Sequence, residues 1–159
     1  MTDDLLQTPL TTTTANARTV QTFLFALADE DFDTVESLAA PELVWQNVGL
    51  PSIRGRARIM KLLRNGQGKF GFEVKFHRIA QDGGTVLTER TDAIIVGPLR
   101  LQFWVCGTFE VRDGKVTLWR DYFNFLDFFV KAPLRAVAAA VFPSLRPTFL
   151  SADRGLRPL

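Results

Sequence analysis

The sequence predicts an α+β fold in which helices cover one face of a mostly antiparallel sheet. Apolar residues recur at helical spacing early in the chain, at Val20, Phe23, Leu24 and Leu27. From Phe72 onward the period changes to two, and short turns that contain glycine separate the alternating segments. Helices that come first and strands that follow in a run favour helices packed on one sheet over a doubly wound fold.

The first two helices are expected before residue 41. The first contains the apolar stripe that begins at Val20. The second is indicated by Asp33 followed three residues later by Glu36, which fits a capping box, and Pro41 is expected to end it.

A strand over 43–47 and a loop over 49–55 are expected next, followed by a third helix over 56–64. The densest basic stretch of the chain, Arg54 to Arg64, includes this helix. No nucleic-acid-binding motif accompanies it, so we expect a solvated helix face and no nucleic acid partner.

Four strands joined by short turns then form an antiparallel meander. They are expected over residues 72–76, 85–96, 101–111 and 116–124. A last helix is expected over 125–141, with a break near Pro133.

The length of 159 residues favours one domain, which we place at residues 15–147. Residues 1–14 contain four consecutive threonines and few apolar side chains, so we expect disorder there, and a loose tail over 148–159. The N-terminus lacks the pattern of a signal peptide, and no apolar run is long enough to span a bilayer. We therefore expect a cytoplasmic protein.

The chain has one cysteine, Cys106, and one histidine, His77, which excludes an internal disulfide and a zinc site of the usual ligands. No metal is expected. His77 falls on a polar strand face with Glu73 and Lys75, and Cys106 has no base near it in sequence. We expect a solvated histidine and an inert thiol.

Charged residues occupy strand faces that are otherwise apolar. Alternation places Asp121 between Trp119 and Phe123 on one face, and Arg90 with Asp92 in the middle of another. Burying such groups is costly unless they are paired. They form either a structural ion pair or an acid and a base whose pKa values are separated, and the spacing alone favours neither.

Three segments resemble, in order and spacing, the motifs of limonene-1,2-epoxide hydrolases. The segments are Trp45-Gln46-Asn47, Glu89-Arg90-Thr91-Asp92 and Trp119-Arg120-Asp121-Tyr122-Phe123. The resemblance extends from about Ala17 to Pro147. Residues 72–79 and 97–107 are similar to the bacterial branch that acts on lipid or steroid epoxides.

The resemblance implies a cone of the nuclear-transport-factor and ketosteroid-isomerase kind, similar to cystatin, with N-terminal helices on the concave face of a curved mixed sheet. It also implies a homodimer that hydrolyses hydrophobic epoxides to vicinal diols without a cofactor or a covalent intermediate. Carried over, Asp121 is the general base, Asn47 holds the attacking water, Asp92 is the general acid, and Arg90 lies between the carboxylates.

The family usually has a tyrosine where this chain has Trp45. An indole donates through its N–H but accepts no hydrogen bond, so we expect Trp45 to position the water less firmly and to weaken the activity. The only tyrosine, Tyr122, alternates onto the face opposite Asp121. We expect Trp119 and Phe123, which share the face of Asp121, to line the substrate pocket.

Two other functions remain open from the sequence. The same fold hosts isomerases and cyclases, which need one base and an oxyanion donor. A pocket protein that binds a lipid or sterol without turnover is the third hypothesis.

Overall fold

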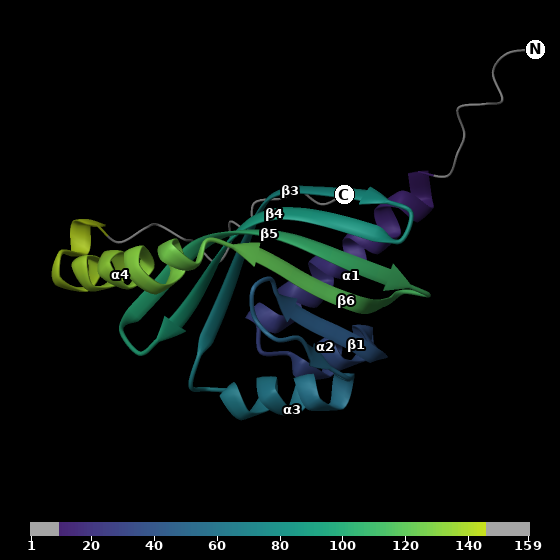
Figure 1. Ribbon diagram of the computed structural model, residues 1–159, viewed down its shortest axis with the longest axis horizontal. Helices are drawn as coiled ribbons and strands as arrows, with labels where there is room; N and C mark the ends of the chain where they lie inside the picture. Colours follow the sequence, from purple (N-terminus) through teal and green to yellow (C-terminus); the bar gives the residue numbers. More distant parts are fainter. Residues whose placement is uncertain (1–9, 146–159) are drawn as a thin grey trace, which may run out of the picture.

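The computed structural model describes residues 10–145 and shows a six-stranded sheet with helices on one side (Figure 1). The elements in chain order are α1 (Leu10–Ala28), α2 (Phe32–Leu38), β1 (Ala39–Asn47), β2 (Ile53–Arg54), α3 (Arg56–Gly66), β3 (Gly71–Asp82), β4 (Thr85–Val96), β5 (Leu99–Arg112), β6 (Lys115–Phe123), a π-helical turn (Asp127–Lys131), α4 (Ala132–Val141) and a 3-10 turn (Pro143–Leu145).

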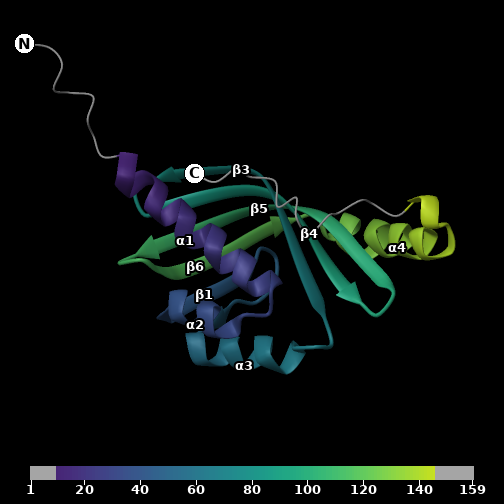
Figure 2. The ribbon, with the colours of Figure 1, turned by 180° about the vertical axis from the view of Figure 1, so that it is seen from behind.

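The strand order across the sheet is β2-β1-β6-β5-β4-β3. Strands β3 to β6 form the predicted antiparallel meander, while β1 pairs with β6 in parallel. The sheet is strongly twisted and curved (Figures 1 and 2). The predicted α+β class with a curved, mixed, mostly antiparallel sheet is confirmed.

Helix α1 crosses one face of the sheet, which we call the inner face (Figure 2). The apolar stripe of α1 packs there: Val20, Phe23 and Leu24 have no exposed surface, and they join a core with Phe76 and Phe109 from the strands. The helical period of the sequence therefore identified the buried side of α1 correctly.

Helix α1 begins at Leu10, inside the segment 1–14 that was expected to be disordered. Extending a formed helix costs little compared with starting one, so the threonines continue it despite their low propensity. Residues 1–9 and 146–159, including the predicted tail at 148–159, lie outside the described residues.

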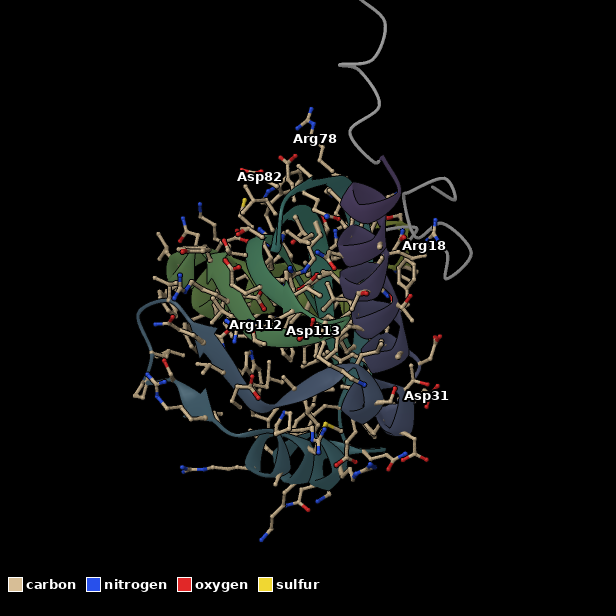
Figure 3. The ribbon with its side chains drawn as sticks, turned by 90° about the vertical axis from the view of Figure 1, so that its right-hand side faces the viewer. Arg18, Asp31, Arg78, Asp82, Arg112 and Asp113 are labelled. Carbon is tan, nitrogen blue, oxygen red and sulfur yellow. The ribbon has the colours of Figure 1, made fainter. Side chains whose placement is uncertain are left out.

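The N-cap of α2 is Asp31, not Asp33 (Figure 3). The Asp31 side chain accepts hydrogen bonds from the backbone N–H of Thr34 at 3.1 Å and from its hydroxyl at 2.6 Å. Asp33 and Glu36 instead form ion pairs with Arg64 of α3. The expected capping box is therefore wrong, because these two side chains are used to join α2 to α3.

Strand β1 starts at Ala39, so Pro41 lies in a strand and does not end the helix. Pro41 is exposed, at a place where the pairing of β1 with β6 shifts register, and such irregularities accommodate a residue without an N–H. The expected loop over 49–55 also contains β2, two residues that pair with Val44 and Trp45 of β1.

The expected break near Pro133 does not occur: residues 125–141 stay helical without interruption, and only the type of helix changes before Pro133. A π-helical turn ends at Lys131, and Pro133 lies in the first turn of α4, where its missing N–H costs no hydrogen bond. Helix α4 lies beyond one end of the sheet, next to β5 (Figures 1 and 2). Within residues 10–145, no helix has both the length and the apolar character needed to cross a membrane.

Candidate active site

The inner face of β4 carries charged side chains that are almost completely buried. Arg90 has 0% exposed surface and Asp92 has 3%. Their neighbours on the same face are Thr88 before them and, across the strand pair, Phe103 opposite Asp92. The alternation in the sequence therefore placed Arg90 and Asp92 on the correct face.

Strand β6 contributes Asp121, which is 5% exposed, from the same inner face. Strand β5 lies between β4 and β6, so two strand spacings, about 10 Å, separate Arg90 from Asp121 in the sheet. The long arginine side chain crosses this distance, and its Nη2 donates to Asp121 Oδ1 at 2.5 Å. The structure thus brings together the three charged residues that the sequence selected.

The Arg90 guanidinium has a different partner at each nitrogen. Its Nε donates to Asp92, 2.9 Å from Oδ1 and 3.0 Å from Oδ2. Nη2 donates to Asp121, and Nη1 donates to the hydroxyl of Thr88 at 2.9 Å. The ring of Phe109 lies 5.7 Å from Cζ. Charge-assisted hydrogen bonds of this kind compensate for the burial of the cation.

Burial and charge separate the protonation behaviour of these groups. Burial, reinforced by the negative charge of Asp121, raises the pKa of Asp92 to about 7, although Arg90 acts in the opposite direction. For Arg90, burial lowers the pKa, but the charges of Asp121 and Asp92 outweigh it and hold the pKa above its ordinary value. At neutral pH the site therefore holds a permanent cation and a carboxyl group close to its titration midpoint.

Asp121 has a second donor in Trp119. The indole Nε1 donates to Asp121 Oδ2 at 2.6 Å. Trp119 is 4% exposed and belongs to the core, with Phe23 packed edge-on and Trp45 stacked on it. Trp119 was expected to line a substrate pocket; in the structure its indole is almost fully buried and donates a hydrogen bond to the Asp121 carboxylate.

Strand β1 places Asn47 directly beside Asp121. The two residues are partners in the parallel pairing of β1 with β6, and Trp45 and Trp119 are the preceding partners, with ring centroids 4.7 Å apart. The Nε1 atom of Trp45 is buried and has no hydrogen-bond partner among the described residues. Asn47 is half-buried and shares the inner face with Asp121.

Aromatic rings extend from the carboxylates toward α4. Phe123, half-buried and two residues beyond Asp121, packs against Phe103, Phe125 and Phe128 at centroid distances of 5.5, 5.1 and 5.3 Å. Phe103 is the strand partner of Asp92. The charged groups therefore border an apolar, aromatic region that includes Phe123.

The outer face of the sheet contains the other candidates from the sequence. His77 is exposed, its Nε2 lies 2.8 Å from Thr91 Oγ1, and its ring stacks on Trp104 at 4.5 Å. Cys106 is also exposed on this face. Thr91 follows Arg90 and so points away from it, which separates His77 from the buried carboxylates by the thickness of the sheet.

A hollow of about 930 Å³ also lies on the outer side. It is lined by Thr91, Trp104 and Arg135, among others, and contains neither Asp92 nor Asp121. This hollow is therefore separate from the buried charged groups of the inner face. Among residues 10–145, no cluster of histidine, cysteine and carboxylate side chains has the composition of a metal site.

Two residues around Arg90 were not singled out from the sequence, Thr88 and Gly107. Thr88 shares the face of Arg90, and Gly107 is its partner on β5. A glycine inside a long strand indicates close approach of another group, so the sequence pattern could have identified Gly107 as a candidate.

The chain matches the model of the limonene-1,2-epoxide hydrolase catalytic domain over residues 14–135. It is 60% identical over 129 residues to the epoxide hydrolase EphG of Mycobacterium tuberculosis, which covers 81% of this chain and 86% of that protein. The solved structure of an LEH-like epoxide hydrolase from M. tuberculosis has 58% identity and a TM-score of 0.83, covering 86% of this chain and 97% of that one.

More distant structures share the fold alone. An NTF2-like protein from Burkholderia xenovorans superposes with a TM-score of 0.63 at 21% identity, covering 76% of this chain and 97% of the other.

Proposed function

The chain belongs to the limonene-1,2-epoxide hydrolase family and is an epoxide hydrolase, and we propose that it opens hydrophobic epoxides in one step with Asp121 as base and Asp92 as acid. The observation that supports this mechanism best is the pair of buried carboxylates on one guanidinium. Their shared cation and unequal surroundings favour one ionised and one protonated partner.

Asp121 acts as the general base in this proposal. Arg90 donates to its Oδ1 and Trp119 to its Oδ2, and both donors stabilise the negative charge. Each oxygen keeps a second lone pair that can accept a proton from water. Because the two donors fix the carboxylate, its free lone pairs have a defined direction.

Asn47 is proposed to orient the attacking water. It is the strand partner of Asp121, and its amide can both donate and accept. Trp45, one step back along β1, can contribute only a donor, which is consistent with its unpartnered Nε1. The water would then be held chiefly by Asp121 and Asn47.

Asp92 is proposed as the general acid. With a pKa of about 7, a large fraction of Asp92 is protonated at neutral pH and can donate to the epoxide oxygen. The water oxygen forms a bond to one epoxide carbon as the C–O bond of the ring at that carbon breaks. The epoxide oxygen takes the proton of Asp92, and Asp121 takes a proton from the attacking water. The reaction consumes only water and is redox neutral, so no cofactor is needed.

The substrate is proposed to be a lipid or steroid epoxide. The aromatic region formed by Phe103, Phe123, Phe125 and Phe128 borders the carboxylates and would accommodate an apolar body. Burial of apolar surface contributes about 25 cal/mol per Å², so such a region favours large hydrophobic substrates.

Incubation in ¹⁸O-labelled water tests the reaction. Limonene oxide, a fatty epoxide and a sterol epoxide should be compared, with the diol products analysed by mass spectrometry. We expect one labelled oxygen in each diol, the largest turnover for the more hydrophobic epoxides, and loss of product in Asp121→Asn. Absence of diol from all three substrates would argue against the mechanism.

A homodimer and a cytoplasmic location are further parts of the proposal. Leu87, Trp104 and Tyr122 are 52%, 50% and 42% exposed on the outer face, which gives a second copy an apolar surface to cover. Sedimentation equilibrium of the whole chain should show a dimer, and Trp104→Glu should shift it toward monomer.

A further inference from the structure

A row of four residues crosses the inner face under the Arg90 guanidinium. Thr88 on β4 pairs with Gly107 on β5, Gly107 pairs with Asp121 on β6, and Asp121 pairs with Asn47 on β1. Arg90 belongs to the neighbouring row, where its partner on β5 is Val105. Its side chain must therefore pass over β5 near Gly107 to reach Asp121.

Gly107 leaves the space that the guanidinium occupies. A Cβ atom at this position would lie 2.3 Å from Arg90 Nη1, 2.6 Å from Thr88 Oγ1 and 2.9 Å from Phe109 Cε2. All three distances are shorter than real Cβ contacts. Gly107 lies in a regular strand and has no positive φ, so space and not backbone conformation requires a glycine here.

Thr88 provides the third partner of the guanidinium. Its hydroxyl accepts from Nη1 at 2.9 Å and lies 3.5 Å from the carbonyl oxygen of Gly107, toward which its own proton can point. The side chain is 5% exposed. It satisfies a buried N–H with a neutral acceptor, which adds no negative charge to a site that already has two carboxylates.

We propose that Thr88 and Gly107 are positioning residues that hold the Arg90 guanidinium in the orientation that joins Asp92 to Asp121. The guanidinium is planar, so fixing Nη1 over Gly107 also fixes the directions of Nε and Nη2. This inference rests on the proposed roles of the two carboxylates. Neither Thr88 nor Gly107 is required to touch the substrate, so both act on the rate and not on substrate binding.

Two substitutions at Thr88 separate positioning from packing. Thr88→Val keeps the volume and removes the acceptor, whereas Thr88→Ser keeps the acceptor and removes a methyl group. We expect kcat to fall about 10-fold in Thr88→Val, with KM within about threefold, and to be retained for the most part in Thr88→Ser. The reverse order, with the serine variant impaired and the valine variant active, would overturn the proposal.

Gly107→Ala tests the space over β5. We expect kcat to fall about 100-fold, because the guanidinium must move by an ångström or more. Gly66→Ala is the matched control, since its new methyl group meets Phe70 Cδ2 at an ordinary 3.5 Å outside the site. Wild-type activity in a folded Gly107→Ala variant would overturn the proposal.

An NMR measurement reads the position of Arg90 without turnover. The Nε–H signal of Arg90, assigned by its loss in Arg90→Lys, should shift in Thr88→Val and Gly107→Ala and stay in place in Gly66→Ala. An Arg90 signal unchanged in both Thr88→Val and Gly107→Ala would contradict the proposal even if the enzyme were active. If the wild type hydrolysed no epoxide, the proposed mechanism would fail, while this signal would still test the positioning of Arg90.

Discussion

Arg90 on β4 reaches Asp121 on β6 across the intervening strand, with Nη2 2.5 Å from Oδ1. The same guanidinium also holds Asp92 through Nε. One cation therefore serves two buried carboxylates, and the trio has a net charge of −1 if both are ionised. A desolvated site disfavours this excess charge, so a proton on Asp92 is the least costly state near neutral pH.

Asp121→Asn should abolish most of the hydrolysis. The amide keeps the size of the carboxylate but cannot take a proton from water, and we expect kcat to fall about 1,000-fold. Asp113→Asn is the matched control: Asp113 has a φ of 50° in the β5–β6 turn, which asparagine tolerates well. Turnover in Asp121→Asn above about one tenth of the wild-type rate would contradict the assignment of the base.

The rate should fall as the pH rises through about 7, because the acid must be protonated and the pKa of Asp92 is raised to about 7. An aspartate with the ordinary pKa near 3.9 would give this decrease in rate below pH 5. Profiles of kcat/KM against pH, measured in overlapping buffers, test this. Asp92→Asn should lose the activity, and with it the decrease in rate through about pH 7. A wild-type rate that stays level to pH 9 would exclude Asp92 as the acid.

The stability of the protein should respond to the same group. The folded-state pKa of Asp92 lies above the unfolded value, so its contribution to the free energy of unfolding is complete below about pH 4 and is lost as the pH rises through about 7. Urea unfolding at a series of pH values should therefore show a smaller decrease over this window in Asp92→Asn than in the wild type. Parallel curves for the two proteins would show that Asp92 titrates normally.

Local sequence patterns predicted which side chains share a face, because alternation in a strand depends on neighbouring residues alone. This is why Arg90, Asp92 and Asp121 were placed together correctly. The cap of α2 and the start of β1 were not, since Asp33 is used in an ion pair with α3 and Pro41 is tolerated at a register shift. Such features depend on elements that lie far apart in the sequence.

The direction of a side chain on its face also depends on tertiary contacts. Trp119 was expected to line the pocket because it shares the face of Asp121. Its stacking on Trp45 and the hydrogen bond from its Nε1 to the carboxylate did not follow from that spacing. A glycine inside a strand, such as Gly107, indicates from the sequence only that some group approaches the backbone closely. The importance of Gly107 arises because the Arg90 side chain passes over β5 at Gly107 on its way to Asp121. That crossing point depends on the register in which β4, β5 and β6 pair.

Trp45→Tyr should increase epoxide hydrolysis, because a hydroxyl can both donate to and accept from the attacking water, whereas the buried Nε1 of Trp45 can only donate and has no partner among the described residues. Trp45→Phe is the matched comparison, since it differs from Trp45→Tyr by that hydroxyl alone. We expect kcat to be about 10-fold higher in the tyrosine variant than in the phenylalanine variant, with similar KM. Equal rates in the two variants would show that position 45 does not hold the water. If both variants also bound a sterol epoxide tightly without turnover, the protein would be a binding protein. The absence of a tyrosine hydroxyl at position 45 would then not explain its lack of hydrolysis.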